Sequence, residues 1–270
     1  MEHKIDHTID IEAYAAKLAH GMSLENMRER DVPKFTPAVP ITERGRLHMK
    51  RVAAEKPCLQ VVIRDRSAKM DFDTAKKRAW SLFQLRAAHI SELEDRDFNW
   101  SFSDNDKKII AGLIRYFIND PQSPYPLNKG IFAYGLPGTG KTEVMQIMKR
   151  FCDEYQLPKA FELTSMSETY VRAKTDAQYN PIEQNIQLDR CLDEFLRHTG
   201  SIIRFGEGLD INEAIIEARY QRFRGGGQLT HVISNATTSQ VQQLMSSMIS
   251  DRVFQMCTSV YFQGESKRSL

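Results

Sequence analysis

The sequence predicts an α/β fold in which helices wrap a parallel sheet of five strands, preceded by a mostly helical N-terminal domain. From about residue 98 onward, short apolar segments alternate with segments of helical periodicity, a pattern typical of parallel sheets covered by helices. A glycine-rich loop joins the first of these apolar segments to a helical one. Residues 1–95 lack this alternation, so the predicted domains are 1–95 and 98–270.

The N-terminal domain begins with helical spacing of apolar residues over 8–31, where Thr8 can act as a cap. Residues 32–41 contain three prolines and therefore predict a linker. A short apolar run at 59–63 favours a strand, and residues 73–93 predict a long helix.

The second domain opens with a helix that Ser103 can cap and whose apolar stripe includes Ile109, Leu113 and Phe117. The five predicted strands follow, with helices between them. These strands are residues 130–134, 160–164, 190–193, 230–234 and 259–263.

The composition predicts a protein with a sizeable core, because 41% of the 270 residues are hydrophobic. The formal net charge of +2 does not by itself indicate a binding partner. Four cysteines lie far apart without a C-x-x-C spacing, which predicts reduced thiols and no metal cluster. The N-terminus lacks the apolar core of a signal peptide, and no run approaches the roughly 18 apolar residues of a membrane span. We therefore expect a cytoplasmic protein without a membrane partner.

A phosphate-binding loop is predicted at residues 135–142, which match G-x-x-x-x-G-K-[ST] between a strand and a helix. Glycines let backbone N–H groups approach phosphates, and the following helix presents its positive dipole end. Lys141 is predicted to reach the β- and γ-phosphates, and the Thr142 hydroxyl to ligate Mg²⁺. The residues predicted to bind the cofactor ATP are Gly135, Pro137, Gly138, Thr139, Gly140, Lys141 and Thr142.

A second, acidic site is predicted at the strand that ends in Asp193 and Glu194. Hydrolysis of ATP requires an acid that holds Mg²⁺ and a group that activates water, so we assign Asp193 to the metal and Glu194 to the water as general base. Asp189 and Arg190 interrupt the apolar run, so either the strand is short or its first part is exposed. The alternative is that the acidic pair begins a solvated helix.

The order of these segments resembles that of AAA+ ATPases of the DnaC and IstB type, which are helicase loaders and transposition helper ATPases. The resemblance covers residues 98–270 and extends past the acidic pair into four further segments. These segments are residues 220–223, 229–237, 249–253 and 260–268. The resemblance implies a P-loop AAA+ αβα sandwich, and because the given sequence ends just after the last predicted strand, no C-terminal helical lid is expected.

The resemblance also implies two further catalytic residues. Asn235 matches the sensor residue that positions the attacking water, and its alternative is an Asx turn. Arg252 matches an arginine finger that acts on ATP held by a neighbouring subunit, which implies a homo-oligomer. The alternative for Arg252 is a salt bridge with Asp251 or a nearby acid.

Single-stranded DNA is the predicted nucleic-acid partner, because the family binds it through the segment after the second strand. Tyr170, Arg172 and Lys174 supply the aromatic and cationic groups that this requires, although a solvated helix face with Tyr170 packed inward explains them equally. Arg219, Arg222 and Arg224 form another basic cluster. The stretch 44–86 is also basic, and it indicates either a surface for nucleic acid or an acidic protein, or a solvated face.

The predicted function is an ATPase that couples hydrolysis to the loading or remodelling of a replicative helicase, or of another DNA-bound protein, on DNA. By analogy with loaders, residues 1–95 bind this partner. The alternatives are a transposition helper ATPase, a DNA-binding adaptor that holds ATP without significant turnover, and a small-molecule phosphotransferase.

Overall fold

The computed structural model describes residues 70–204, 207–264 and 266–267. The predicted helices at 8–31, the linker at 32–41 and the strand at 59–63 lie outside the described residues. Among the described ranges, no helix combines the length and the apolar composition that a membrane span requires.

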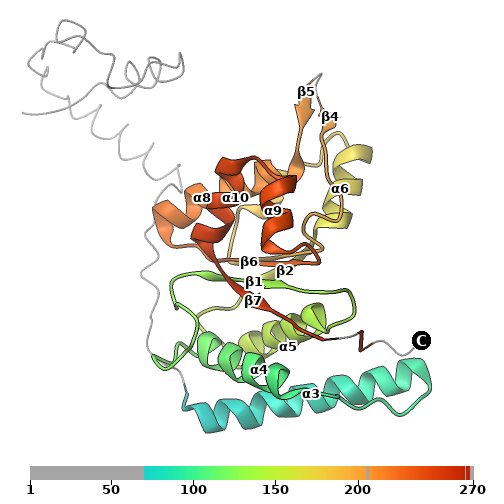
Figure 1. Ribbon diagram of the computed structural model, residues 1–270, viewed down its shortest axis with the longest axis vertical. Coiled ribbons are helices and arrows are strands. Elements are labelled where there is room, and N and C mark those ends of the chain that lie inside the picture. Colours follow the sequence, from blue (N-terminus) through green and yellow to red (C-terminus); the bar gives the residue numbers. More distant parts are fainter. Residues whose placement is uncertain (1–69, 205–206, 265, 268–270) are drawn as a thin grey trace, which may run out of the picture. The chain divides into compact units, whose positions relative to one another are not determined.

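The centre of the fold is a parallel sheet of five strands, as the sequence predicts, and its strand order is β2-β3-β6-β1-β7 (Figure 1). The strands are β1 (Gly130–Tyr134), β2 (Glu162–Ser165), β3 (Arg190–Asp193), β6 (Thr230–Ser234) and β7 (Cys257–Tyr261). Strands β1, β3 and β6 have the predicted bounds. Strand β7 begins earlier than predicted because Cys257 already pairs with Gly130, and β2 begins later because the Ala160 N–H closes a turn onto the Leu157 carbonyl.

Helices cover both faces of this sheet, so the fold is a three-layer αβα sandwich (Figure 1). Ile131 and Ala133 of β1 belong to one apolar core and Phe132 to the other, as alternation along a buried strand requires. The first core is closed by α3 (Phe72–Glu94), α4 (Asp104–Phe117) and α5 (Lys141–Glu154). The second is closed mainly by α6 (Met166–Thr175), α8 (Ile211–Gly226), α9 (Thr238–Leu244) and α10 (Ser247–Met256), and the short α7 (Pro181–Asn185) precedes β3.

Helix α4 begins at the predicted cap. The Ser103 hydroxyl accepts a hydrogen bond from the Asp106 N–H, and the Asp106 carboxylate accepts one from the Ser103 N–H at 2.9 Å. This reciprocal capping box satisfies two backbone donors that the helix itself leaves unpaired. The predicted stripe of Ile109, Leu113 and Phe117 is buried in the first core.

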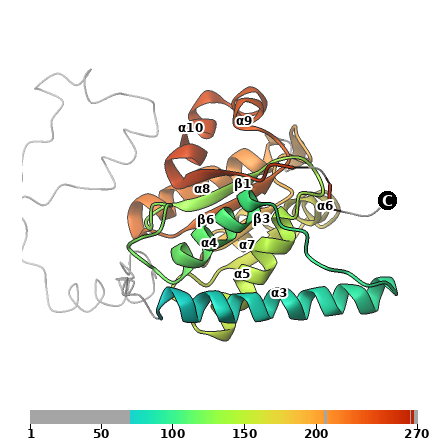
Figure 2. The same ribbon diagram turned by 60° about the horizontal axis from the view of Figure 1, so that its bottom comes forward.

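Helix α3 packs into the same core as α4 and α5, although the sequence analysis placed it in the domain at 1–95 (Figure 2). Its buried residues Ala75, Ala79, Leu82 and Phe83 face that core. Arg86 also forms two hydrogen bonds of 2.8 and 2.9 Å to Glu143 in the first turn of α5. That residues 1–95 form a partner-binding domain stays a prediction. The last helix of this range, α3, contributes to the apolar core beside the sheet.

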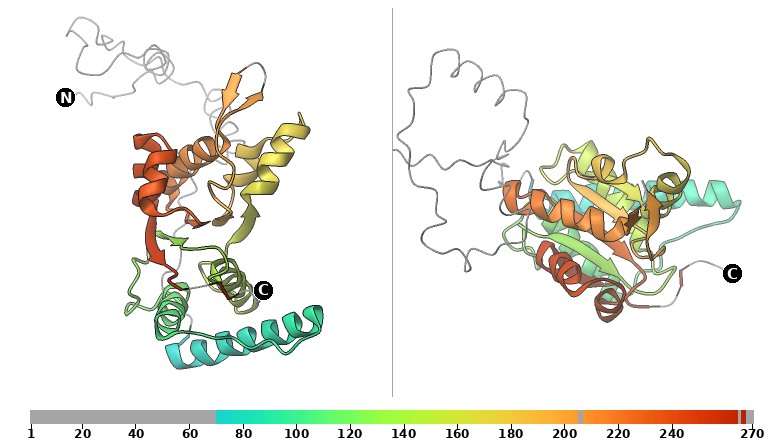
Figure 3. Two further views of the ribbon diagram at one scale, coloured as in Figure 1. Left: turned by 45° about the vertical axis from the view of Figure 1, so that its right-hand side comes forward. Right: turned by 90° about the horizontal axis from the view of Figure 1, so that it is seen from above.

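A two-stranded antiparallel hairpin, β4 (Ile202–Arg204) with β5 (Glu207–Leu209), follows β3 and was not predicted. It projects beside α6, as Figure 3 shows in its left view. Each strand has only three residues, too few to show the alternation by which strands are recognised, and Ile203 is 76% exposed. The sequence therefore predicts only helix between β3 and β6.

Candidate nucleotide-binding site

The phosphate loop runs from the end of β1 to the first residue of α5, as predicted. Gly140 is the N-cap of α5 and has a left-handed backbone with φ of 88°, which glycine adopts without strain. No side chain among the described residues caps this helix. The N–H groups of its first turn and its positive dipole end are thus available to an anion in the loop.

Lys141 lies across the loop rather than pointing into solvent. Its ammonium donates to the carbonyl oxygens of Gly135 and Leu136, both at 2.8 Å, and the residue is only 5% exposed. The positive charge is therefore held inside the curve of the loop. A phosphate group that enters the loop meets this charge directly.

Thr142 and Asp193 meet at the carboxyl edge of the sheet, although 51 residues separate them in the sequence. The Thr142 hydroxyl donates to Asp193 Oδ1 at 3.2 Å. Burial raises the pKa of Asp193, while hydrogen bonds from the Glu194 N–H and Thr142 act in the opposite direction. Asp193 is buried at the end of β3, which contradicts the alternative of a solvated helix start.

This pair of oxygen donors suits Mg²⁺, which prefers oxygen ligands and is held by one or two carboxylates together with substrate phosphates and water. Within the described residues, no group of three or more His, Cys, Asp or Glu side chains could hold a metal by itself. A magnesium ion at Thr142 and Asp193 would thus depend on the phosphates of the nucleotide for its remaining ligands.

Glu194 directly follows β3 and has a positive φ of 56°. Its carboxylate accepts a hydrogen bond from the Ser165 hydroxyl at 3.1 Å and forms an ion pair with Arg197. Burial acts to raise the pKa of Glu194, but the hydroxyls of Ser167 and Ser165 and the guanidinium of Arg197 lower it overall. Glu194 is consequently ionised at neutral pH.

Ser165 and Arg197 were missed by the sequence analysis. Ser165 ends β2 and is in register with Asp193, so the pairing of two neighbouring parallel strands places it at the acidic pair. The sequence signal that could have found Ser165 is a hydroxyl residue at the end of a predicted strand.

The apolar run before Asp193 is interrupted because β3 is short. Asp189, just before this strand, is buried and accepts a hydrogen bond from the Leu229 N–H at 2.8 Å.

Asn235 follows β6, the strand between β3 and β1, and its side chain is exposed at the same edge of the sheet. Its side chain makes no hydrogen bond with the part of the chain that the structure describes. The Thr237 N–H, which an Asx turn would use, instead donates to Gln240 at 2.8 Å. The Asn235 side chain therefore does not form an Asx turn and is exposed to a ligand at this edge of the sheet.

Arg252 lies on α10, which leads into the amino end of β7 and thus to the edge of the sheet opposite the phosphate loop. It forms an ion pair with Glu217 of α8 and lies 5.0 Å from the centre of the Tyr220 ring. The alternative for Arg252 was a salt bridge with Asp251 or a nearby acid. The structure shows this salt bridge with Glu217, whereas Asp251 accepts a hydrogen bond from Gln255. The finger role stays a prediction, and Arg252 cannot serve the ATP site of its own chain from this position.

The residues predicted to contact single-stranded DNA divide into two groups. Tyr170 stacks on His198 at 4.9 Å, and the Lys174 ammonium lies 5.3 Å from the Tyr170 ring, so both side chains share one face of α6. The predicted cluster at the end of α8 is different, because Arg219 is 1% exposed and donates to backbone carbonyls of Asn185 and Leu229. Assigning Arg219 to a basic surface was therefore wrong.

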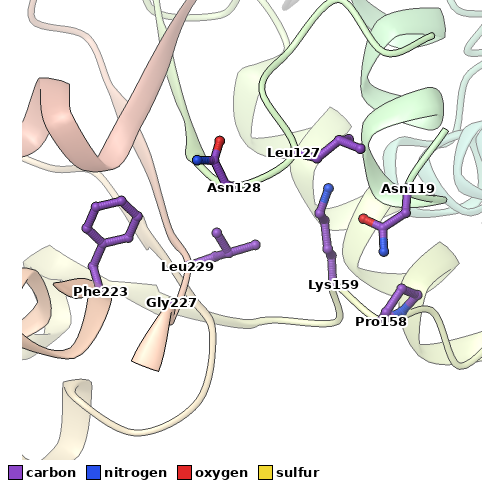
Figure 4. A pocket seen from close by; sticks show the side chains of 8 residues that line it. All are labelled: Asn119, Leu127, Asn128, Pro158, Lys159, Phe223, Gly227 and Leu229. Carbon is purple, nitrogen blue, oxygen red and sulfur yellow. The ribbon is translucent and has the colours of Figure 1, made fainter. Parts of the chain in front are cut away.

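A cavity of about 200 Å³ lies at the amino ends of the strands, away from the phosphate loop (Figure 4). Its walls come from the segments that precede β1, β2 and β6 and from the end of α8. The lining residues are Asn119, Leu127, Asn128, Pro158, Lys159, Phe223, Gly227 and Leu229. It is separate from the predicted nucleotide site.

The strand order and the glycine-rich loop after β1 define an αβα fold of the P-loop type. Among solved structures, the chain is similar to the crystal structure of the DnaI, with 16% identity, 63% of this chain and 88% of that chain covered, and a TM-score of 0.48. A putative primosome component from Streptococcus pyogenes serotype M3 has 15% identity, coverages of 62% and 84%, and a TM-score of 0.46. The DnaC helicase loader has 12% identity, coverages of 61% and 94%, and a TM-score of 0.45. No protein-family model matches the chain, and no curated protein matches it either.

Proposed function

We propose that this protein binds ATP with Mg²⁺ and hydrolyses it. The observation that carries the proposal is the contact of 3.2 Å between Thr142 of the phosphate loop and Asp193 of β3. A glycine turn without a nucleotide gives no reason for a buried carboxylate to meet the hydroxyl at the first turn of α5. An ATP site requires this meeting, because one metal ion must contact both groups and the phosphates.

Each side chain of the site has a distinct role in this proposal. Lys141 exchanges the loop carbonyls for the β- and γ-phosphates, and Thr142 and Asp193 would hold Mg²⁺, which would neutralise charge on the phosphates. Glu194, ionised at neutral pH, accepts a proton from the attacking water. Asn235 orients this water from the neighbouring strand, and Arg252 of an adjacent subunit stabilises the charge that develops.

We further propose that hydrolysis serves the loading or remodelling of a replicative helicase on DNA. The support is the order of segments after the acidic pair, which resembles that of the DnaC and IstB type. Residues 1–95 would bind the partner, and α6 with Tyr170 and Lys174 on one face would meet single-stranded DNA. A transposition helper has the same fold and site, and it differs in taking a transposase as its partner.

The test is the ATPase rate per subunit, measured with and without single-stranded DNA over a range of protein concentrations. A rate that rises with concentration and with DNA supports an oligomeric ATPase completed by Arg252 in trans. The matched variant is Glu194→Gln, which should retain ATP binding and lose turnover. If this variant and the wild-type protein hydrolyse ATP equally slowly yet bind DNA in the same ATP-dependent way, the protein is an adaptor and the hydrolysis proposal is wrong.

A further inference from the structure

The chain returns to the phosphate loop after β7. The Phe262 N–H donates to the Tyr134 carbonyl at 2.8 Å, which extends the path of β7 alongside the end of β1. Further on, the backbone N–H of Lys267 donates to the Gly138 carbonyl at 2.8 Å. We name Ser266 and Lys267 the strap, since they lie against the loop at Gly138 and Gly140.

The strap lies in close contact with Gly138. A β-carbon added to Gly138 would lie 2.1 Å from the Ser266 hydroxyl oxygen, which is far inside van der Waals contact. Gly138 also has a φ of 82°, which side chains disfavour. Glycine is thus required at this position both by the backbone of the loop and by the approach of the strap.

Lys267 anchors the strap to α4. Its ammonium lies 2.8 Å from the carboxylate of Asp106 and 5.3 Å from the centre of the Phe102 ring. Asp106 is buried, and the same carboxylate oxygen accepts hydrogen bonds of 2.9 Å from both the N–H and the hydroxyl of Ser103. The anchor is therefore fixed within the capping box at the start of a helix that belongs to the core.

The hydrogen bond to Gly138 has a consequence for the orientation of one peptide group. In a trans peptide the C=O and the N–H point in opposite directions. The Gly138 carbonyl points outward to the strap, so the N–H of Thr139 points the opposite way, to the Leu136 carbonyl at 3.5 Å, which also accepts a hydrogen bond from the Lys141 ammonium. A phosphate that takes the place of this carbonyl at Lys141 would meet the Thr139 N–H as well. Inward N–H groups are the donors with which such loops hold phosphates.

We propose that the strap, anchored by Asp106, is a positioning element of the phosphate loop that keeps the Thr139 N–H directed at the phosphates of the nucleotide. The proposal rests on the proposed ATP binding and deepens it. Lys267 and Asp106 are positioning residues, because they act on the nucleotide only through Gly138. The strap thereby links the segment after the last strand to the loop after the first one.

The test compares Lys267→Met with Lys107→Met in the full chain. Methionine keeps the length of the side chain and removes the charge, and Lys107 forms only an exposed ion pair with Asp104 on the same helix α4. Hydrogen exchange of the nucleotide-free protein is measured at the backbone N–H groups of residues 136 and 138–142, and ATP affinity is measured in parallel. Loss of one anchoring interaction should speed exchange in the loop and raise the Kd for ATP, each about fivefold, while Lys107→Met changes neither.

A second variant, Asp106→Asn, keeps an acceptor for Ser103 and removes the charge that Lys267 binds, so it should reproduce the faster exchange. Exchange at residues 136–142 that stays at the wild-type rate in both variants, or that rises equally throughout the sheet, would overturn the strap as a positioning element. If the wild-type protein binds no ATP while the loop amides still respond to Lys267→Met, the strap stands and the proposed ATP binding fails. The two proposals are therefore tested separately.

Discussion

Replacing the buried Arg219 should strongly destabilise the domain, although its sequence context suggests a basic surface. The guanidinium is 1% exposed and donates to the Thr230 hydroxyl at 2.7 Å and to the carbonyls of Asn185, Leu188 and Leu229 at 2.5, 3.2 and 2.7 Å. Burial lowers its pKa to about 10, so it remains charged at neutral pH. These four hydrogen bonds join α8 to the segments that precede β3 and β6.

The magnitude follows from these contacts. A hydrogen bond to a charged group contributes about 1.5–3 kcal/mol, but four bonds from one side chain are not additive. Removing a buried charged partner costs about 3–5 kcal/mol, and we expect Arg219→Met to lower the free energy of unfolding by this amount. With a urea m-value of about 2–3 kcal/mol/M, the midpoint of denaturation should fall by about 1–2.5 M.

The assay is urea unfolding followed by circular dichroism, with Arg224→Met as the matched control. Arg224 is exposed in the last turn of the same helix, so its replacement should change stability by less than about 0.5 kcal/mol. A midpoint of Arg219→Met equal to that of the control would refute the structural role. If such a stable variant also lost affinity for single-stranded DNA, the assignment of Arg219 to a DNA-binding surface would be restored.

Three further predictions concern the site. Lys141→Ala should abolish ATP binding, because the only side-chain cation within the curve of the described loop is lost; unchanged affinity in a fluorescent-nucleotide titration would contradict the phosphate loop assignment. Arg252→Ala should leave ATP binding intact and slow hydrolysis at concentrations where wild-type subunits assemble, and a wild-type rate there would remove the finger role. Arg197→Ala should shift the acid limb of the hydrolysis rate to higher pH: Glu194 has a lowered pKa and stays ionised as pH falls, and without Arg197 it protonates at higher pH. An unmoved pH profile would show that Glu194 does not set this limb.

The sheet could be predicted from the sequence because each of its strands is a short apolar run between turn signals. Three of the five strands have the predicted bounds, and the phosphate loop lies where its motif places it. The hairpin of β4 and β5 could not be predicted, since strands of three residues carry no periodicity. The site was predictable in its residue types, while the contacts of Glu194 with Ser165 and Arg197 depend on strand register and on a positive φ.

Arg219 shows why charge in a sequence is a weak guide to surface. A run of arginines at the end of a helix normally indicates a solvated face. Helix α8 turns Arg219 inward, while Arg224 stays exposed five residues later. The inward position is tolerable because one planar guanidinium donates to several backbone carbonyls of α7 and of the turns before β3 and β6 together. The side chain that resembled a nucleic-acid contact instead fixes the amino edge of the sheet, while the proposed ATP site lies at the opposite edge.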